Sequence, residues 1–553
     1  MFNILNLFLL LLSLSVSLMW TIRRCMVALH LLQLDSYSNS RLLTWFGKGL
    51  FTRFFEYYSI LICCILSGIL IFFKLLELPA QNTLILALWS ILGILAFLHK
   101  KSPKNKKPLV FTGRAIRIFV LALIICIVFS GMVFLSIIYN IFPPQIEVSL
   151  WALINGLVLI QLAPLTIILS NLLLFPVQTT INNIYLAKAK RKLRTISPRV
   201  IGITGSYGKT STKNILANLL NERYSALMTP QSFNTLMGIS RTINENLSQE
   251  HKMFLVEMGA YRPGDIKEIS DLVNPQVGII TAIGPQHLER FKTLESIENA
   301  KYELIASLPN SGVAVFNNDD VRCRKLADIT SRVKVLRYGL DNSQNNLELW
   351  GKEITQSSRG TSFTLVDREG REKPVLTVLL GMHNVSNIIG AACIALEMGL
   401  DLEDIYRGIV KIKPTPHRLQ TIIGKGGVVV IDDSYNSNPV GSREALNVLS
   451  RFDSGRRVLV TPGMVELGNS EDKYNQEFGA QAAKICDLII LVGPGQTKAI
   501  CKGLTSEGFS ADKIRLVSSL DEANLQLRSF LRAGDTVLFE NDLPDLYIKT
   551  GLV

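Results

Sequence analysis

The chain has 553 residues, which is enough for two or three domains and a sizeable core, and 48% of them are hydrophobic. Its formal net charge of +13 is uneven, because residues 1–199 carry 19 Lys and Arg against 4 Asp and Glu, whereas the remainder carries 39 against 41. The excess flanks apolar segments, which indicates membrane-flanking charge and disfavours a nucleic-acid-binding protein. The eight scattered cysteines make no disulfide framework and no CxxC pair for zinc, so reduced thiols are expected.

The first 175 residues contain five apolar runs, each near the roughly 20 residues that span a bilayer. The runs cover residues 2–20, 57–78, 83–98, 118–142 and 150–175. A cleaved signal peptide is the alternative for the first run, but that run has no basic residues before it and its positive charges follow the apolar core. The sequence therefore predicts an all-α transmembrane region of about five helices over residues 1–175.

The connectors between these runs alternate in charge. Basic connectors follow the first, third and fifth runs, and their residues are Arg23, Arg24, Arg41, Lys48, Arg53, Lys100, Lys101, Lys104, Lys106, Lys107, Arg114, Arg117, Lys188, Lys190, Arg191, Lys192 and Arg194. The loops 77–82 and 140–149 contain no Lys or Arg. The positive-inside rule then predicts a multi-pass protein of the cell (inner) membrane, with its N-terminus outside and everything after residue 175 in the cytoplasm. Residues 176–198 are expected to form a basic amphipathic juxtamembrane linker.

From Val200 the pattern becomes that of an α/β protein. Short apolar runs predict buried strands at Val200–Thr204, Met253–Glu257, Val277–Thr281, Val313–Phe316, Val428–Ile431, Val458–Thr461 and Leu488–Val492. Helical periodicity separates them, for example at Thr210–Asn221 and Asn387–Met398. Strands that alternate with helices predict a parallel, doubly wound sheet.

A phosphate-binding loop is the strongest motif. It reads Gly202-Ile-Thr-Gly-Ser-Tyr-Gly-Lys-Thr-Ser211 and lies between a predicted strand and a predicted helix. The backbone from Gly205 through Ser206 and Tyr207 to Gly208 can wrap phosphates at the helix N-terminus. Lys209 would contact the β- and γ-phosphates, the Thr210 hydroxyl would reach Mg²⁺, and Ser211 completes the run. The usual first glycine of this motif falls at Ile203, so the prediction rests on Gly205, Gly208, Lys209 and Thr210.

Several further motifs accompany this loop. They are Thr229-Pro-Gln-Ser-Phe-Asn-Thr-Leu-Met-Gly238, Val256-Glu-Met-Gly-Ala260, Thr281-Ala-Ile-Gly-Pro-Gln-His-Leu-Glu289, Asn299-Ala-Lys-Tyr-Glu303, Phe316-Asn-Asn-Asp-Asp320, Gly381-Met-His-Asn-Val-Ser-Asn387, Pro416-His-Arg-Leu419, Ile431-Asp-Asp-Ser-Tyr-Asn-Ser-Asn-Pro439 and Gly463-Met-Val-Glu-Leu-Gly468. Together they resemble the Mur ligase family from about Arg199 to the end. Within it, the pattern is most similar to ligases that add D-alanyl-D-alanine to a muramoyl tripeptide. The resemblance implies a P-loop central domain over residues 199–418 and a Rossmann-like C-terminal domain over residues 419–553.

The resemblance also implies a site for ATP and Mg²⁺. Glu257 would hold the Mg²⁺ of the phosphate loop, and His287 would hold a second Mg²⁺. Lys301 matches the lysine that related ligases carbamylate, and a carbamate is an anion that suits the second metal. Arg418 would contact the γ-phosphate through its guanidinium fork.

The adenosine side of the predicted site is less specific. Asn384 and Asp433 match the adenosine contacts of the family, with Asp433 accepting from ribose hydroxyls. Asp432 is an equally good chemical candidate by sequence. Tyr435 stacking on the nucleotide is a weaker hypothesis, and His383 is expected to be structural.

Activation of a carboxylate as an acyl phosphate fits these residues, so we expect an ADP-forming amide ligase of cell-wall precursor synthesis. Its partners would be a peptidoglycan precursor peptide, an amino acid or dipeptide, and the membrane, without nucleic acid. The alternatives are a membrane ligase for another γ-glutamyl or cell-envelope peptide and an ATP-driven transporter or sensor. The predicted spans contain almost no ionisable residues, which disfavours a transporter.

Two features depart from the family pattern. The membrane region stands where soluble ligases of this type carry a uridine-nucleotide domain. In addition, Glu540-Asn541-Asp542 stands where those ligases typically show Lys-Gly-Ser. These departures leave open whether the acceptor is UDP-linked or lipid-linked and which amine is added.

Overall fold

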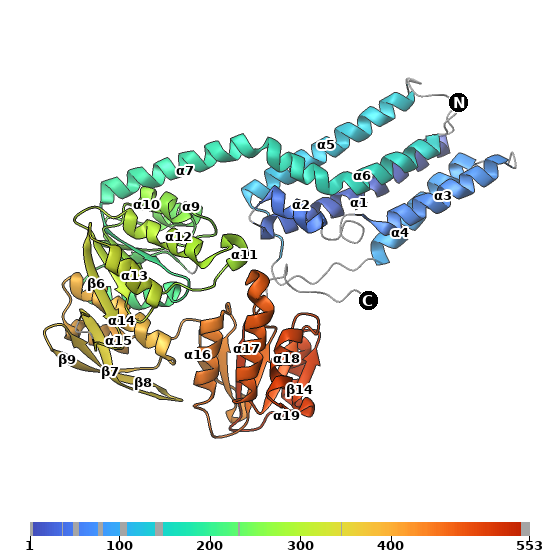
Figure 1. Ribbon diagram of the computed structural model, residues 1–553. Helices are drawn as coiled ribbons and strands as arrows, with labels where there is room; N and C mark the ends of the chain where they lie inside the picture. Colours follow the sequence, from blue (N-terminus) through green and yellow to red (C-terminus); the bar gives the residue numbers. More distant parts are fainter. Residues whose placement is uncertain are drawn as a thin grey trace. The chain divides into compact units, whose positions relative to one another are not determined.

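A computed structural model describes residues 4–35, 37–47, 55–75, 81–99, 108–138, 148–230, 233–343 and 346–542. The chain divides into two compact units, Met1–Asn182 and Asn183–Val553 (Figure 1). The division falls inside helix α7 (Phe175–Ile196), in the segment where the sequence predicts the basic linker.

The first unit is all-α. Its helices are α1 (Ile4–Leu34), α2 (Asn39–Gly47), α3 (Tyr57–Leu75), α4 (Gln81–His99), α5 (Gly113–Ile138) and α6 (Val148–Leu173). Within the described ranges, three helices are long and apolar enough to cross a membrane, at Phe8–Leu34, Gly113–Met132 and Ser149–Leu173. The described apolar parts of α3 and α4, Tyr57–Phe72 and Thr83–Leu98, are shorter. The five predicted runs therefore form five apolar helices, three of which reach a spanning length on this criterion.

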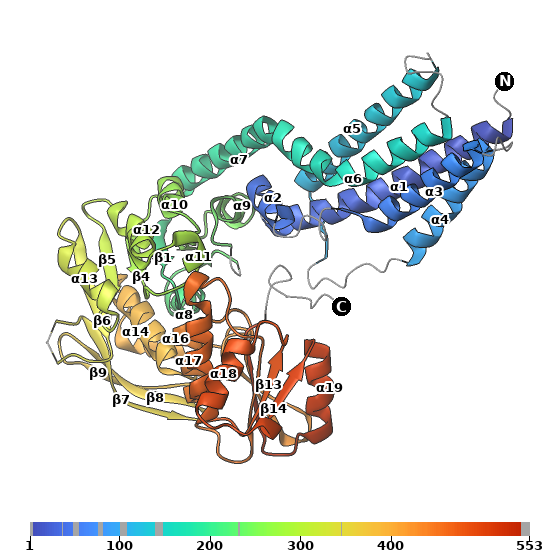
Figure 2. The same cartoon turned by 45° about the vertical axis from the view of Figure 1, so that its right-hand side comes forward.

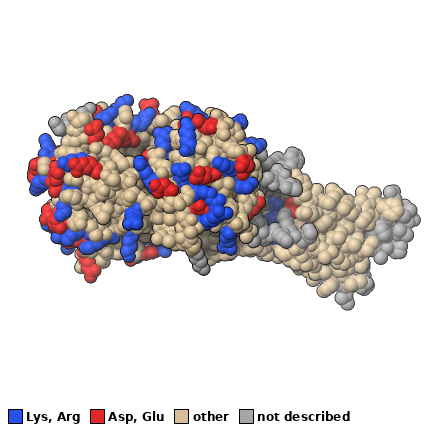
Figure 3. Space-filling model, turned by 90° about the horizontal axis from the view of Figure 1, so that it is seen from below, with Lys and Arg blue, Asp and Glu red and all other residues tan. Residues whose placement is uncertain are grey.

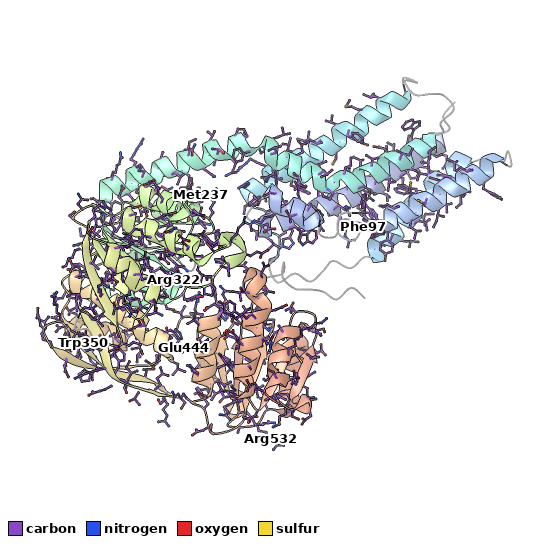
Figure 4. The ribbon with its side chains drawn as sticks, viewed as in Figure 1. Phe97, Met237, Arg322, Trp350, Glu444 and Arg532 are labelled. Carbon is purple, nitrogen blue, oxygen red and sulfur yellow. The ribbon has the colours of Figure 1, made fainter. Side chains whose placement is uncertain are left out.

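Helix α1 corrects the prediction of a connector at Arg23 and Arg24, because the helix continues through both residues to Leu34. No Pro or Gly interrupts the chain between Trp20 and Leu34, so nothing local ends the helix there. Arg23 is accommodated inside the unit, where its Nη1 donates to the carbonyl of Phe97 on α4 at 2.8 Å. Figure 4 labels Phe97 on that helix.

Polar contacts join the ends of α1 and α6 to the start of α5. Arg114 at the start of α5 donates to Oδ1 of Asn171 at the end of α6, at 3.1 Å. Gln33 at the end of α1 donates to the carbonyl of Val110, just before α5, at 2.7 Å. Helix α5 therefore runs opposite to α1 and α6, as the predicted alternation requires. Over the rest of this unit the surface seen in Figure 3 is largely free of charged residues, whereas the second unit is covered with them.

Part of the predicted charge pattern lies outside the described residues. This part comprises Lys48, Arg53, Lys100, Lys101, Lys104, Lys106, Lys107, residues 77–80 and residues 140–147.

The second unit begins with a nine-stranded sheet in the order β2-β3-β1-β4-β5-β6-β7-β8-β9. Its strands are β1 (Arg199–Thr204), β2 (Ala226–Met228), β3 (Met253–Glu257), β4 (Val277–Ile280), β5 (Val313–Asn317), β6 (Lys334–Gly339), β7 (Leu349–Ser357), β8 (Gly360–Asp367) and β9 (Glu372–Thr377). Pairing is parallel from β2 to β7, but β8 and β9 are antiparallel, which corrects the expectation of an entirely parallel sheet. Only two residues join β7 to β8, and so short a connection permits only an antiparallel neighbour.

Helices cover both faces of this sheet, which makes it doubly wound. They are α8 (Lys209–Leu220), α9 (Leu236–Asn246), α10 (Asp265–Val273), α11 (Leu288–Phe291), α12 (Leu294–Ala306), α13 (Val321–Ile329), α14 (Met382–Glu397) and α15 (Leu402–Val410). One core packs α8, α14 and α15 against the sheet, and a second packs α9, α10, α12 and α13 against the other face. Alternate residues of the buried strands point into the two cores, so the strand interiors are apolar on both faces, as at Val200-Ile201 in β1 and Met253–Val256 in β3.

A second sheet follows in the order β10-β11-β15-β12-β13-β14. Its elements are β10 (Gln420–Ile423), β11 (Val429–Asp433), α16 (Pro439–Leu449), β12 (Arg457–Thr461), α17 (Glu471–Ala483), β13 (Leu488–Val492), α18 (Lys498–Ser506), β14 (Ile514–Val517), α19 (Leu520–Phe530) and β15 (Thr536–Glu540). Short 3₁₀ turns lie at Lys425–Gly427, Gly468–Ser470 and Ala511–Lys513. All pairs are parallel except β10 with β11, and α18 and α19 lie on opposite sides of the sheet (Figure 2).

The seven predicted strands are confirmed as β1, β3, β4, β5, β11, β12 and β13. In the first sheet, β1 lies between β3 and β4, so chain connections leave β1 in both directions. Ligands of open α/β sheets bind beyond the carboxyl ends of the strands at such a reversal. The loop after β1, the end of β3 and the loop after β4 meet there.

Candidate active site

The phosphate loop occupies the turn between β1 and α8. Gly208 precedes α8 with φ of 80°, and a β-carbon there would collide with Oδ1 of Asn387 on α14. The Ser206 amide donates to the carbonyl of Ala282 at 2.7 Å, and Nζ of Lys209 donates to the carbonyl of Gly205 at 2.6 Å. Glycine is therefore required at 208 both by the left-handed backbone and by the close approach of α14.

A cavity of about 490 Å³ lies against this loop. The predicted site residues that line it are Ser206, Tyr207, Gly208, Lys209, Thr210, Ser211, Glu257, His287, Lys301, Asn384, Arg418 and Asp433. Gly205 is not among the lining residues, and a β-carbon added to it would collide with Oγ1 of Thr281. Glu444, labelled on α16 in Figure 4, also lines the cavity, so the lining comes from both α/β sheets.

Glu257 ends β3 and its carboxylate is held by two neighbours. Nζ of Lys213 donates to Oε2 at 3.0 Å, and Nδ2 of Asn234 donates to Oε1 at 3.2 Å. Burial opposes ionisation, but Lys213 and Lys209 lower the pKa of Glu257 below its ordinary value. Lys213 was not predicted from the sequence, although it lies one helical turn after Lys209, on the same face of α8, which is the signal that would have found it.

The Lys213–Glu257 pair gives a first prediction. Both side chains are buried, with exposures of 0% and 1%, so Lys213→Met leaves an uncompensated charge inside the protein. We expect a loss of about 3–5 kcal/mol in the free energy of unfolding, seen as a lower melting temperature of the detergent-solubilised protein. The double variant Lys213→Met, Glu257→Leu is the control and should recover most of the loss, since no charge remains. Equal losses in the two variants would contradict a role for charge pairing.

Lys301 lies on α12, 3% exposed, and its side chain reaches the cavity. Within the described part of the chain, no hydrogen bond or ion pair is formed by its Nζ. Burial, reinforced by the nearby positive charge of Lys209, lowers the pKa of Lys301 well below its ordinary value. Burial also lowers the pKa of Lys209, to about 8, although Glu257 opposes the shift. A lowered pKa favours the neutral amine of Lys301, which is the form that reacts with CO₂ to give a carbamate.

His287 follows β4 and has a left-handed backbone, with φ of 53°. Its Nδ1 lies in short hydrogen-bond contact with Oε2 of Glu466, from the loop after β12. The rings of His287 and Tyr261 lie 5.0 Å apart. Glu466 was not predicted as a site residue; the sequence placed it only within a motif.

The donor chemistry of the cavity fits Mg²⁺. A carboxylate and a hydroxyl, from Glu257 and Thr210, line it together, and Mg²⁺ favours one or two carboxylates completed by substrate phosphates and water. In the described ranges, no group of three or more His, Cys, Asp and Glu side chains is arranged to hold a metal without such help. A metal in this cavity would therefore depend on the nucleotide for most of its ligands.

The adenosine side of the site distinguishes Asp433 from Asp432. Asp433 lines the cavity, whereas Oδ2 of Asp432 pairs with His417 at 2.8 Å and its Oδ1 accepts from Ser434. The geometry therefore favours Asp433. Asn384 lines the cavity and donates to the carbonyl of Leu380 at 2.8 Å.

Arg418 enters the cavity from the start of the C-terminal sheet. Its guanidinium lies over the ring of Tyr435, 4.3 Å from the ring centroid. The ring of Tyr435 thus supports Arg418. Tyr435 also lines the cavity, and its stacking on the nucleotide stays a prediction.

Asp433 also belongs to a buried pair of carboxyl groups. It ends β11 beside Glu540 at the end of β15, and Glu540 is 1% exposed. The Ser437 hydroxyl donates to Oε1 of Glu540 at 2.6 Å, and the Leu419 amide donates to Asp433 at 3.1 Å. Burial raises the pKa of Asp433 to about 6, and burial next to Asp433 raises that of Glu540 well above its ordinary value. The pair therefore retains a proton near neutral pH. The signal for this pair in the sequence was Glu540, which stands where the resembling ligases typically have Lys.

This pair gives a second prediction, for pH dependence. Because the folded state binds protons on this pair more tightly than the unfolded state, the stability they contribute is present at pH 4 and is lost as pH rises, beginning with Asp433 at about pH 6. Glu540→Gln keeps the acceptor for Ser437 and lets an amide donate to Asp433. At pH 8 we expect this variant to be more stable than the unmodified chain by on the order of 2 kcal/mol, with the difference vanishing near pH 4. Melting temperatures across this pH range test it, and a pH-independent difference would contradict a shared proton.

Both α/β domains that line this cavity match domains of known proteins. Residues 203–395 match the model of the Mur ligase middle domain, and residues 417–540 match that of the Mur ligase glutamate ligase domain. UDP-N-acetylmuramoyl-tripeptide–D-alanyl-D-alanine ligase of Bacillus subtilis is 31% identical over 354 residues, which cover 64% of this chain and 75% of that protein. The ligase of the same name from Escherichia coli is 32% identical over 59% of this chain and 71% of its own length.

Solved structures give the same relationship. A crystal structure of MurF from Acinetobacter baumannii superposes with a TM-score of 0.59 at 28% identity, covering 66% of this chain and 77% of that one. MurF from Thermotoga maritima in complex with ADP superposes with a TM-score of 0.58 at 26% identity, covering 66% and 81%.

Proposed function

Because this chain belongs to the Mur ligase family, we propose that it adds D-alanyl-D-alanine to a muramoyl tripeptide of cell-wall precursor synthesis. It is an ATP-dependent ligase that forms an amide bond. One observation about this chain's own residues supports the proposal most strongly. Lys209 and Glu257, from the domain of the first sheet, line the same cavity as Arg418, which directly precedes the second sheet.

The chemistry assigned to this cavity is a two-step ligation. An oxygen of the acceptor carboxylate attacks the γ-phosphorus, and the bond to ADP breaks, which gives an acyl phosphate. The amine nitrogen then attacks the acyl carbon, phosphate leaves, and the nitrogen loses a proton. Lys209 and Arg418 would stabilise charge on the transferring phosphoryl group. Mg²⁺, held by Thr210 and Glu257, would neutralise phosphate charge, and His287 with carbamylated Lys301 would serve a second ion.

An assay with the full-length protein in detergent tests the proposal. ATP and Mg²⁺ are supplied with a muramoyl tripeptide, either UDP-linked or lipid-linked, and with D-alanyl-D-alanine. ADP and phosphate should appear only when both substrates are present, together with a product of the expected mass. Coupled formation of AMP would contradict γ-phosphoryl transfer.

A second candidate differs in the amine that is added. Glu540-Asn541-Asp542 is acidic where a basic loop is typical, and Asn541 follows the buried carboxyl pair with its amide bonded to the carbonyl of Asp433 at 3.2 Å. An acidic surrounding suits a substrate with a free ammonium group. If single amino acids or diamines support phosphate release and D-alanyl-D-alanine does not, the product is another γ-glutamyl or cell-envelope peptide.

The location of the enzyme belongs to the same proposal. The helices of the first unit would lie in the cell membrane with the N-terminus outside, and the ligase would lie in the cytoplasm, where ATP is available. On α7, Ile184, Lys188 and Arg191 are exposed along one face, whereas Ala189 and Leu193 are buried on the opposite face. Each basic residue near an anionic leaflet contributes about 1 kcal/mol, so this face favours contact with the membrane surface. Membrane placement would bring the enzyme close to a lipid-linked acceptor.

Topology gives a third prediction. In a variant without native cysteines, single cysteines at Gln81 and Gln145 should react with an impermeant reagent applied from outside. A cysteine at Lys104 should be protected until the membrane is opened. Positions 104 and 145 lie outside the described residues, and the expectation for them rests on the charge pattern. Outside labelling at position 104 would contradict both the topology and the cytoplasmic ligase.

A further inference from the structure

A contact between the two α/β domains of the second unit joins Glu466 to the loop that carries His287. Glu466 lies between β12 and α17 in the C-terminal domain, and His287 lies between β4 and α11 in the central domain. The carboxylate of Glu466 reaches Nδ1 of His287, and its carbonyl accepts from the amide of Glu289 at 3.3 Å. Gly468 approaches the same loop, because a β-carbon there would lie 3.6 Å from Cα of Glu289.

The two partners of this contact share an unusual backbone. His287 and Glu466 have φ of 53° and 65°, in the left-handed region that L-residues seldom adopt. Such conformations cost on the order of 1 kcal/mol or more and are maintained only when the surrounding structure fixes them. Both residues of this contact therefore have a backbone that the surrounding structure must fix.

The contact decides which nitrogen of His287 carries the proton. An ionised carboxylate only accepts, so Nδ1 must donate, and the lone pair of the ring then lies on Nε2. Histidines that bind metals typically donate their other nitrogen to a carboxylate in this way, which fixes the tautomer and the ring direction. Tyr261 limits the remaining rotation of the His287 ring, because the two ring centroids lie 5.0 Å apart. The guanidinium of Arg290 lies 4.6 Å from the centroid of the Tyr261 ring.

We propose that Glu466 is a positioning residue that orients His287 for the second Mg²⁺ and thereby links approach of the C-terminal domain to completion of the metal site. The inference rests on the proposed function, because the role of His287 as a ligand does. Arg418 and Glu466 both lie within residues 417–540, which match the Mur ligase glutamate ligase domain, so binding of ATP and binding of the second ion favour the same arrangement of the two domains.

Manganese binding tests this linkage without turnover. The full-length protein in detergent, with a non-hydrolysable ATP analogue, is titrated with Mn²⁺ while free Mn²⁺ is followed by electron paramagnetic resonance. The unmodified chain should bind two ions. Glu466→Ala should weaken the affinity of the second site for Mn²⁺ by about 10–100-fold and leave the affinity of the first site unchanged. Glu466→Gln keeps an acceptor oxygen, so its second-site affinity should lie between those of Glu466→Ala and the unmodified chain. In a His287→Ala background, Glu466→Ala should have no further effect on the second site.

Glu289→Gln is the matched control, because it removes a neighbouring charge and keeps the backbone bond to Glu466. Hydrogen exchange of residues 287–292 should quicken in Glu466→Ala and remain unchanged in the control. An unchanged second site, a single Mn²⁺ site in the unmodified chain, or additive losses with His287→Ala would overturn the proposal. These measurements need no ligation, so failure of the positioning role and failure of the proposed reaction are separate results.

Discussion

Lys209→Ala should lower kcat/KM for ligation by about 10³-fold or more, while the protein keeps its fold. The reason is that Lys209 lines the cavity at the phosphate loop, and its charge would act on the phosphoryl group as negative charge shifts during transfer. In the structure Nζ is bonded to loop carbonyls of Gly205 and Ser206, at 2.6 and 3.2 Å, so the ammonium is held within the loop that would surround the phosphates.

The measurement is substrate-dependent phosphate release, accompanied by the melting temperature of the same preparation. Lys267→Ala is the control, since Lys267 lies on α10 with its side chain 63% exposed and pairs only with Asp271 at the surface. It should match the unmodified chain in both readouts. Residual activity of Lys209→Ala above about a tenth would mean that the loop does not act on the transferring phosphate.

Lys301→Ala should lower the rate by about 100-fold or more, because it removes the group proposed to become an anionic metal ligand. When a neutral lysine amine attacks CO₂, the N–C bond forms as a C–O π bond breaks and its electron pair moves to oxygen. The nitrogen then releases a proton, so the neutral amine becomes an anionic carbamate. The buried, unpaired side chain of Lys301 provides such an amine beside Lys209. Short carboxylic acids should partly restore the alanine variant by supplying the missing anion, and Lys301→Arg should not be restored, because the larger cation occupies the space.

A direct signature is available for the carbamate. After equilibration with ¹³C-bicarbonate, the unmodified chain should show a carbamate carbonyl resonance that Lys301→Ala lacks. Lys325→Ala, a change at an exposed lysine of α13, is the control and should retain both the resonance and the activity. Full activity of Lys301→Ala would mean that Lys301 is an unreactive buried lysine.

The phosphate loop, seven strands of the two sheets and the apolar helices could be predicted from local sequence. Each depends on short-range physics: glycines for a tight turn before a helix, apolar runs for buried strands, and apolar length with flanking charge for membrane helices. The family motifs added Glu257, His287, Lys301 and Arg418, and the structure brings all four to one cavity. Their roles remain predictions for the experiments above.

Other features depended on contacts between residues far apart in the chain. The sequence could not separate Asp433 from Asp432, because both end the same strand; the choice arises from the direction of each side chain, with Asp432 turned towards His417. The antiparallel strands β8 and β9 escaped prediction because pairing direction depends on partners as well as on the strand itself.

By itself, the sequence determined where the chain is apolar, where it turns and which residues resemble those of a ligase. Only the tertiary structure paired Lys213 with Glu257, Glu540 with Asp433 and Glu466 with His287. The members of these pairs are 44, 107 and 179 residues apart, and nothing local marks them as partners. The reason is physical: the energy of a buried charge or a strained loop depends on the groups packed against it. Those groups become neighbours only when the sheets fold and the domains come into contact.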